Sequence, residues 1–392
     1  MITPRIPFPP FRGDNLHAFN IARTLAQSNE LDLVTLIAND KQIKFVDELK
    51  KEKIRTHVVN NPIFISVLKL IPAFFHNIPF QVAFFSSRKL AKLISDLTNK
   101  NKYDLIYFHL IRSIQYFPST KNSSAIKVVD FTDAVSLYLS RYLKFLKNPF
   151  RKLFFNSELK RIEKYEVNAK VFDSVFLCSE IDKNHLEKKL EGVIIQILRN
   201  GVNEKFFNPP VVPFEKYRIM FSGNMPYYPN KDAALFFAKN IFPAVSIKYP
   251  DSKFYIVGQK PSRTILKLSS EKIIVTGFVE DIRNEYLKSE INVAPIRFGA
   301  GTPNKVIESL ALGIPVVASE TAIGGLPNEL RKYIFIANTA DEFIEKISYI
   351  FENETVRIDL MKECSELVPK ILGWDVIIKN FESYIKSKLE TK

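Results

Sequence analysis

One stretch of the chain, residues 292–319, constrains the fold more than any other. It opens with a short apolar run that predicts a buried strand, passes through a glycine-punctuated turn, and continues with apolar residues at helical spacing. Thr302 is the expected N-cap, Pro303 the expected first helical residue and Gly313 the left-handed stop. A second apolar run follows. The stretch therefore predicts a β-α-β unit of a doubly wound α/β fold, with its glycine turn at the helix N-terminus.

This arrangement is typical of an anion site. Gly299 and Gly301 allow close approach of the backbone to a ligand, and the free N–H groups of the first helical turn favour a phosphate. Lys305 lies in that turn, where a cation opposes the helix dipole unless an anion is bound nearby. Glu308 lies about one turn later, within reach of ribose hydroxyls. An ordinary surface ion pair between Lys305 and Glu308 is the alternative interpretation.

The same stretch resembles the donor-binding motif of retaining glycosyltransferases with the two-domain GT-B architecture, the large group 1 family (family four). The resemblance implies that Glu308 holds the nucleotide ribose and that the preceding loop holds the diphosphate of a nucleoside-diphosphate sugar. The first of the family's two spaced glutamates falls on Ala300, so the chain is similar to a glycine-rich variant found among exopolysaccharide-type sugar transferases. The donor-binding residues that it implies are Gly223, Asn224, Phe278, Val279, Arg297, Gly299, Ala300, Gly301, Thr302, Asn304 and Glu308.

The resemblance also implies the architecture: two Rossmann-like α/β domains facing across a cleft, with a C-terminal helix crossing back to the first domain. A length of 392 residues suits two domains, each with its own core. We expect an acceptor-side domain at 1–203, a proline-marked linker at 204–215, a donor-nucleotide domain at 216–372 and the returning helix at 373–392. The apolar face expected for that helix is Ile377, Ile378, Phe381 and Ile385.

In the second domain, cations are expected to stabilise the leaving diphosphate. Lys231 matches a lysine that the family uses for this purpose, and Lys305 is its expected partner in catalysis. Asn224 stands where the family usually has an arginine. Lys305 or Arg297 is expected to supply the missing charge.

In the first domain, His109 ends an apolar run that predicts a strand, and the resemblance makes it a catalytic candidate near the donor sugar. A structural histidine is the alternative. Asp133 is a candidate for contact with the sugar or the acceptor hydroxyl, or else a helix cap. Arg12, Gly13 and Asp14 precede an amphipathic helix and match the family's acceptor-side loop; a capped turn would explain them equally well.

The net charge of +14 is concentrated in the first half: residues 1–205 carry +12 and residues 206–392 carry +2. An anionic membrane surface, nucleic acid or a solubility bias could each explain it. No nucleic-acid-binding motif accompanies the bases, so we expect no nucleic acid. Residues 141–170 predict a basic, aromatic helical pair divided at Pro149, and its expected lipid contacts are Arg151, Lys152, Arg161 and Lys164. The aromatic-rich region 63–85 predicts buried packing, with an acceptor or membrane surface as the alternative.

Several expectations concern what the chain lacks. Cys178 and Cys364 have no paired spacing, so we expect no disulfide framework. No aspartate cluster indicates a metal, and no cofactor is expected besides the donor substrate. The start of the chain shows no signal-peptide pattern, which predicts a cytoplasmic location, peripheral on the inner face of the plasma membrane. Only Ile2 and Thr3 precede a proline-rich turn, so the first strand is expected to be shortened.

These expectations predict a metal-independent, retaining, hexosyltransferase-type glycosyltransferase that moves sugar from a nucleotide sugar to a glycan or lipid-linked acceptor in cell-surface polysaccharide biosynthesis. Two alternatives remain open at this stage. One is a non-catalytic GT-B partner protein that binds a sugar nucleotide, which a donor-hydrolysis assay would distinguish. The other is a GT-B sugar-nucleotide epimerase, which analysis of products without acceptor would distinguish.

Overall fold

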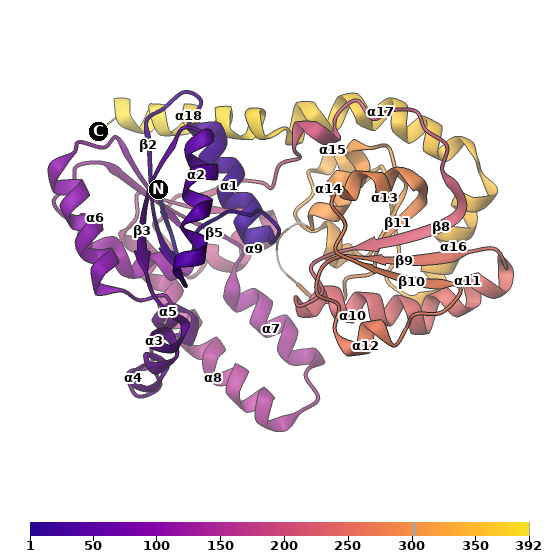
Figure 1. Ribbon diagram of the computed structural model, residues 1–392, viewed down its shortest axis with the longest axis horizontal. Helices are drawn as coiled ribbons and strands as arrows, with labels where there is room; N and C mark the ends of the chain where they lie inside the picture. The colour runs from indigo at the N-terminus through magenta and orange to yellow at the C-terminus, as the bar shows by residue number, and fades with distance from the viewer. Residues whose placement is uncertain (300, 302, 392) are drawn as a thin grey trace. The chain divides into compact units, whose positions relative to one another are not determined.

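A computed structural model of the chain describes residues 1–299, 301 and 303–391 (Figure 1). The chain forms two compact units. Unit 1 comprises Met1–Arg199 together with the chain from Ile377 onward, and unit 2 comprises Asn200–Val376. Each unit is built on its own wholly parallel sheet, which confirms the predicted α/β class. In the described part of the chain, no helix has the length and apolar composition needed to cross a bilayer.

The sheet of unit 1 has seven strands in the order β3-β2-β1-β4-β5-β6-β7. This order reverses direction between β1 and β4, and open α/β sheets place their ligands at such a switch point, beyond the carboxyl ends of the strands. The first strand is as short as predicted. The strands are β1 Ile2–Thr3, β2 Leu31–Ile37, β3 Ile54–Asn60, β4 Leu105–His109, β5 Ile126–Thr132, β6 Ser174–Leu177 and β7 Ile195–Ile197.

Helices cover both faces of this sheet and extend beyond one end of it (Figure 1). Pro149 begins the second of two helices in the basic region, as predicted. The helices are α1 Gly13–Leu25, α2 Lys44–Lys51, α3 Ile63–Leu68, α4 Leu70–Phe75, α5 Phe80–Phe84, α6 Arg88–Lys100, α7 Val135–Phe145, α8 Pro149–Glu166, α9 Glu180–Glu187 and, from the end of the chain, α18 Trp374–Glu390.

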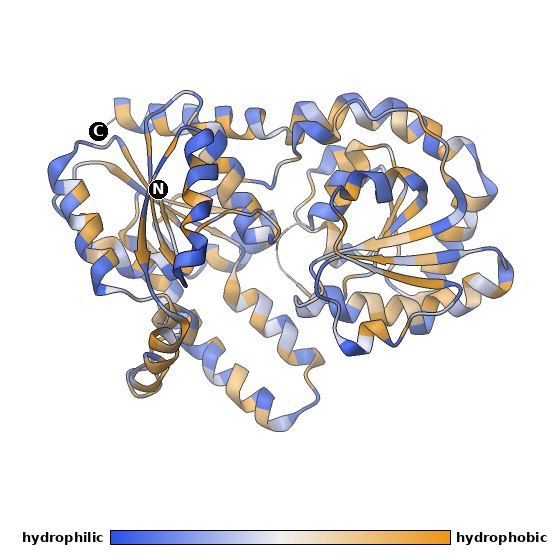
Figure 2. Ribbon diagram, in the orientation of Figure 1, coloured by the Kyte–Doolittle hydropathy of each residue, from blue (hydrophilic) through white to orange (hydrophobic). Residues whose placement is uncertain are grey.

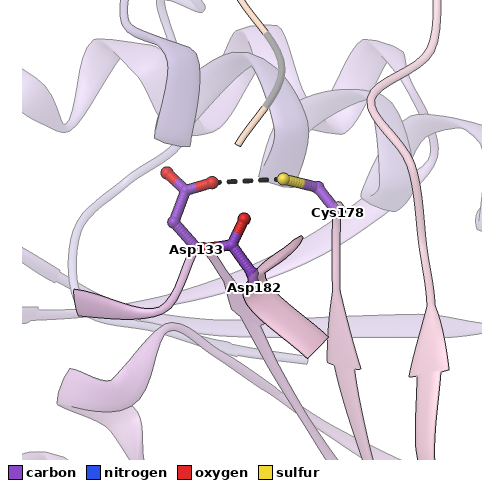
Figure 3. Close-up of side chains that lie close together, drawn as sticks. All are labelled: Asp133, Cys178 and Asp182. Carbon is purple, nitrogen blue, oxygen red and sulfur yellow. Dashed lines mark hydrogen bonds between the residues drawn. The ribbon is translucent and has the colours of Figure 1, made fainter. Parts of the chain in front are cut away.

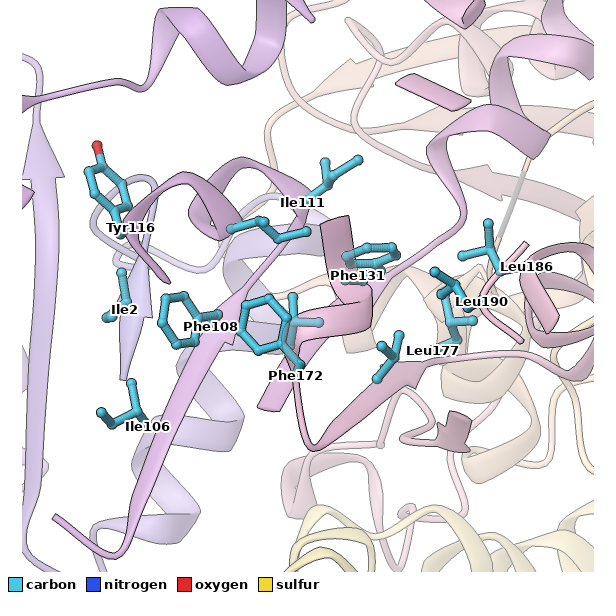
Figure 4. Packing of buried hydrophobic residues seen from close by; sticks show 14 of the residues in the cluster. Ile2, Ile106, Phe108, Ile111, Tyr116, Phe131, Phe172, Leu177, Leu186 and Leu190 are labelled. Carbon is cyan, nitrogen blue, oxygen red and sulfur yellow. The ribbon is translucent and has the colours of Figure 1, made fainter. Parts of the chain in front are cut away.

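Alternation along β4 divides the packing of unit 1 between the two faces of the sheet. Phe108 points into the main core, where its ring meets Phe172 at 5.0 Å, as Figure 4 shows for the buried cluster around it. The neighbouring Tyr107 points to the opposite face and meets Phe381 of α18 at 5.9 Å. Phe176 of β6 meets the same ring at 5.1 Å. The predicted apolar face of α18 is therefore confirmed, and the helix covers the sheet of unit 1.

Unit 2 repeats the pattern with six strands in the order β10-β9-β8-β11-β12-β13, so its switch point lies between β8 and β11. The strands are β8 Glu215–Ser222, β9 Lys253–Val257, β10 Ile273–Gly277, β11 Ser289–Ala294, β12 Val316–Ala318 and β13 Ile334–Ile336. The helices are α10 Tyr228–Phe236, α11 Phe242–Lys248, α12 Arg263–Leu266, α13 Ile282–Lys288, α14 Asn304–Ala311, α15 Asn328–Arg331, α16 Ala340–Glu352 and α17 Thr355–Leu372.

Two sequence-based expectations about elements were wrong. Pro303 is the N-cap of α14, and the helix begins one residue later than predicted, at Asn304. The region 63–85 forms three short helices, and the apolar side chains of α3 and α4 are largely exposed instead of packing inward.

Candidate functional site

The turn between β11 and α14 lies at the switch point of unit 2. Gly301 has φ +73°, a left-handed conformation that glycine adopts without strain, and Gly299 is buried. Asn304 begins the helix, so its first N–H groups point back toward the carboxyl ends of the strands. The predicted site residues Ala300 and Thr302 lie outside the described residues. This edge of the sheet has the backbone geometry that suits an anionic group.

Lys305 is buried in the first turn of α14. Its ammonium Nζ donates to Asn230 Oδ1 at 2.8 Å and lies 4.4 Å from the centre of the Phe221 ring. Burial lowers the pKa of Lys305 to about 7, although the carboxylate of Glu308 acts in the opposite direction. An anion bound at the helix N-terminus would favour the charged form of this lysine.

The start of α10 lies beside Lys305. Asn230 accepts from Lys305 and its Nδ2 donates to the backbone oxygen of Asn224 at 3.1 Å. A Cβ at Gly223 would lie 2.7 Å from the Asn230 side chain, so this close packing requires glycine. Lys231 follows on α10 and is half-buried. The structure therefore brings Gly223, Asn224 and Lys305 together, with Asn230 as the residue that joins them.

Glu308 lies one turn further along α14, and its carboxylate contacts a buried tyrosine. Tyr286 of α13 donates its hydroxyl to Glu308 Oε2 at 3.2 Å and is also 2.7 Å from Ser222 Oγ. Burial raises the pKa of Glu308, and the hydrogen bond from Tyr286 opposes that effect. Among the described residues, no hydrogen-bond partner of Oε1 is found. Tyr286 thus holds one of the two carboxylate oxygens of Glu308 in place.

Other predicted donor residues lie at the same carboxyl edge of the sheet. Arg297 follows β11 and is bound bidentately by Asp232, with Nε–Oδ2 and Nη2–Oδ1 distances of 2.8 and 2.6 Å. Its charge is therefore largely compensated within the protein. Phe278 and Val279 follow β10, and the Phe278 side chain is 57% exposed, as an apolar wall for a base would require.

In unit 1, His109 ends β4 as predicted and belongs to a buried polar network. Asp130 Oδ2 lies 2.9 Å from His17 Nε2 and 3.4 Å from His109 Nδ1, and it also accepts from the hydroxyl of Tyr107. Burial alone would raise the pKa of Asp130, but the two histidines hold it well below its usual range. The imidazole of His109 is thereby fixed at the switch point between β1 and β4.

The same histidine contacts the predicted acceptor-side loop. His109 Nε2 lies 3.2 Å from the backbone oxygen of Asp14, in the first turn of α1, which begins at Gly13. Arg12 Nε lies 3.3 Å from Asp14 Oδ1. The structure therefore brings together four of the residues singled out in the first half of the chain.

Asp133 lies in a second polar group, drawn in Figure 3 with Cys178 and Asp182. Cys178 Sγ donates to Asp133 Oδ1 at 3.1 Å, and the ligand atoms of the three side chains lie within 4.8 Å of one another. Asp182 accepts from the backbone N–H of Ala134 at 2.9 Å and from the hydroxyl of Ser179. Burial and the neighbouring Asp182 raise the pKa of Asp133 to about 7. The sequence showed no aspartate cluster, but the fold brings Asp133 and Asp182 together with Cys178, and hydrogen bonds hold part of this arrangement.

Sequence reasoning missed four residues that organise these sites: Asn230, Tyr286, His17 and Asp130. Pro229 in the first turn of α10 is a signal that would have drawn attention to Asn230. Tyr286 contacts Glu308 across 22 residues, and His17 contacts Asp130 across 113. Nothing in the local sequence pattern points to such pairings.

A family profile described as "Glycosyl transferases group 1" matches residues 216–353, the region that contains Gly223, Lys305 and Glu308. This part of the chain is therefore similar to the group 1 glycosyltransferases. No curated protein sequence matches the chain.

Solved structures similar to this chain show its GT-B fold. Sucrose-phosphate synthase from Thermosynechococcus elongatus matches with a TM-score of 0.71 at 15% identity, covering 100% of this chain and 98% of that one. A glycosyltransferase from Rickettsia africae ESF-5 matches with a TM-score of 0.67 at 17% identity, covering 97% and 96%. Anabaena Alr3699/HepE, solved in complex with UDP and glucose, matches with a TM-score of 0.68 at 15% identity, covering 98% of each chain.

Proposed function

We propose that this protein is a glycosyltransferase that moves a hexose from a nucleoside-diphosphate sugar to a glycan or lipid-linked acceptor, with retention, in cell-surface polysaccharide biosynthesis. The observation that carries the proposal is the buried ammonium of Lys305 in the first turn of α14, beside the glycine turn and one turn before Glu308. A similar fold, that of HepE, has been solved with UDP and glucose. We assign the diphosphate to the glycine turn and Lys305, and the ribose to Glu308.

The proposed chemistry needs stabilisation of the leaving group. As the bond from the anomeric carbon to the diphosphate oxygen breaks, negative charge develops on that oxygen. Lys305, Lys231 and the first N–H groups of α14 would meet it, so we propose a metal-independent reaction. The acceptor oxygen forms its new bond on the same face of the sugar, and its proton passes to the departing phosphate. In unit 1, we propose His109 and Asp133 as catalytic residues.

Replacement of Glu308 tests the donor assignment. Glu308→Ala should weaken binding of the nucleotide sugar by roughly 10- to 100-fold, because a hydrogen bond to a charged group contributes about 1.5–3 kcal/mol. Tyr286→Phe should have a smaller effect, since it removes only the hydroxyl that orients the carboxylate. Calorimetric titration with UDP- and GDP-sugars would measure both and would identify the base.

The matched control is Glu345→Ala, on the exposed side of α16. Its donor affinity should equal that of the wild type. Wild-type affinity in Glu308→Ala would contradict the assignment of the ribose. Hydrolysis of the bound donor in the absence of acceptor would distinguish an enzyme from a protein that only binds sugar nucleotides.

We further propose that unit 1 lies peripherally on an anionic membrane, at the cytoplasmic face. An apolar surface formed by α3, α4 and the start of α8 supports this. Figure 2 shows α3 and α4 as strongly hydrophobic segments. Such a collection of exposed apolar side chains is typical of an interaction site. Its members are Ile63, Phe64, Ile65, Val67, Leu68, Ile71, Phe74, Phe75, Ile78, Phe150, Leu153 and Phe154.

Contacts join the two parts of this apolar surface. Phe154 of α8 stacks on Phe80 of α5 with ring centres 5.5 Å apart. The guanidinium of Arg161 lies over Phe80 at 4.5 Å and over Phe74 at 5.4 Å. Arg161 is itself buried, so the expectation that it contacts lipid was wrong. Its guanidinium instead packs against the rings of Phe74 and Phe80 on their buried side.

The charges around the apolar surface match an anionic bilayer. Residues 53–95 and 134–157 contain no aspartate or glutamate. Lys144, Lys147, Arg151 and Lys152 are exposed, and in the described part of the chain none of the four forms an ion pair. Apolar side chains flanked by uncompensated cations are the pattern of a segment that lies in the membrane interface.

A further inference from the structure

Three arginines converge on one carboxylate in unit 1. The distances to Asp14 are 3.7 Å from Arg5 Nη2, 3.3 Å from Arg12 Nε and 3.8 Å from Arg112 Nη1. One negative charge therefore faces three positive ones. We call Arg5, Arg12, Arg112 and Asp14 the arginine cluster.

The arginine cluster lies at the switch point of the sheet of unit 1. Arg5 follows β1 and Arg112 follows β4, and these strands are neighbours. Arg12 and Asp14 lie at the N-terminal end of α1. This is the edge at which open parallel sheets bind their ligands, and it includes His109, which contacts Asp14.

Two buried donors of the arginine cluster lack a hydrogen bond. Among the residues that the structure describes, no acceptor bonds Arg5 Nε or Arg112 Nη1, although the latter lies 3.8 Å from Asp14 Oδ2. Other atoms of the cluster are firmly held: Arg112 Nε donates to Gln81 Oε1 at 3.0 Å, and both guanidinium groups lie over the Phe85 ring, at 5.0 and 5.3 Å. Unpaired buried donors cost free energy, and a bound oxyanion would remove that cost by accepting from them. Because both guanidinium groups are already held in place, they can bind an oxyanion without being ordered first.

The charge balance agrees with this geometry. Burial lowers the pKa of Arg112 to about 10, and the nearby charges of Arg5 and Arg12 lower it further than Asp14 can compensate. Burial raises the pKa of Asp14, but the three arginines hold it below its usual value. An additional anion would relieve the repulsion among the cations.

We propose that the arginine cluster binds a phosphoryl group carried by the acceptor. An excess of two positive charges matches a phosphate dianion, and guanidinium forks bind phosphate oxygens bidentately. That the ligand is an acceptor rests on the proposed sugar transfer. The affinity of the arginine cluster for phosphate does not depend on that proposal. The same chemistry occurs in a soluble sugar phosphate and in a lipid-linked phosphate.

Calorimetric titration of the full-length protein tests the proposal. The probes are inorganic phosphate, glucose 6-phosphate and a short-chain prenyl monophosphate. All variants carry Lys305→Met, which weakens anion binding at α14. Arg112→Gln should weaken phosphate binding at least about tenfold, since a charge-assisted hydrogen bond is lost. Asp14→Asn should strengthen it severalfold, because the competing carboxylate charge is removed.

The gain expected from Asp14→Asn cannot come from damaged folding, and Arg88→Gln, on the exposed start of α6, is the matched control. No measurable phosphate binding, or equal affinity in the parent and Arg112→Gln, would overturn the proposal, as would weaker binding in Asp14→Asn. Tighter binding of the prenyl phosphate than of glucose 6-phosphate identifies a lipid-linked source, and the reverse identifies a soluble one. If phosphate fails to bind while Glu308→Ala still weakens nucleotide binding, only this inference is wrong.

Discussion

Burial sets the chemistry of Lys305. Its ammonium contacts a neutral amide and an aromatic ring, so the charged form is poorly stabilised and the pKa falls from 10.5 to about 7. The unfolded chain would keep that proton up to about pH 10.5. The unfolded state therefore binds more protons between these values, and the free energy of unfolding should rise as the pH increases from about 7 toward 10.5.

The affinity for the donor should depend on pH in the opposite direction to the free energy of unfolding. The proposed diphosphate stabilises the protonated lysine, so we expect the affinity for a nucleotide sugar to fall as the pH rises above about 7, by up to about tenfold per unit. Calorimetry across this pH range would measure it. Lys305→Met should bind more weakly and without this slope; a wild-type pH profile in Lys305→Met would show that another group is responsible.

Individual site residues were predictable where a local pattern identified them. Glycine at a helix start, and a lysine and a glutamate on its first turns, were enough to select Lys305 and Glu308. The partners of these residues were not predictable. Asn230 and Tyr286 approach from other helices, and the contact depends on how the strands are ordered in the sheet, which periodicity does not reveal.

Among the elements, α18 packs against strands that are far from it in the sequence, β4 and β6 of unit 1. Its apolar face was predicted from spacing, and Ile377, Ile378, Phe381 and Ile385 are all buried. The stretch 63–85 shows the opposite outcome. Its apolar composition predicted burial, but α3 and α4 are each too short to bury a continuous apolar face against the sheet. Most of their apolar side chains are exposed.

Replacing Phe381 tests the role of α18. The ring is 3% exposed and contacts Tyr107 and Phe176 on the sheet. Phe381→Ala should lower the free energy of unfolding by about 3–5 kcal/mol, through lost transfer free energy and a residual cavity. Urea denaturation followed by circular dichroism would measure the loss. Lys379→Ala, on the exposed side of the same helix, is the control; a similar small effect of both changes would contradict this packing role.

At the scale of the whole molecule, the charge asymmetry noted in the sequence has a structural counterpart in unit 1. The apolar surface and the uncompensated cations of α7 and α8 belong to the same half of the chain that carries the net charge of +12. Composition alone could not separate a membrane surface from a solubility bias, because it does not tell which side chains face outward. The α/β class, in contrast, was predictable from the β-α-β pattern of residues 292–319, and the two-domain architecture from the resemblance that this stretch carries.

Co-sedimentation with vesicles tests the membrane proposal. The wild type should bind phosphatidylglycerol vesicles at low salt, bind phosphatidylcholine vesicles weakly, and dissociate at high salt as the charges are screened. Lys147→Gln, Arg151→Gln and Lys152→Gln together should reduce the partition coefficient by roughly 100-fold, at about 1 kcal/mol for each cation. Phe64→Ser with Phe75→Ser should reduce binding to both lipids.

The matched control combines Arg263→Gln, Lys267→Gln and Ile358→Ser, all exposed in unit 2. It should bind as the wild type does. Equal bound fractions for the wild type and the unit 1 variants would contradict the membrane proposal, and so would a stable dimer of the lipid-free protein that Phe75→Ser dissociates.

The return of α18 to unit 1 also affects how the protein is made. Tyr107 and Phe176 are synthesised before unit 2, whereas Phe381, which covers them, is synthesised after it. Throughout that interval, one face of the first sheet lacks its covering helix, and it is then most exposed to chaperones and proteases. Emergence of α18 from the ribosome, rather than completion of residues 1–199, is therefore the step at which unit 1 reaches its full stability.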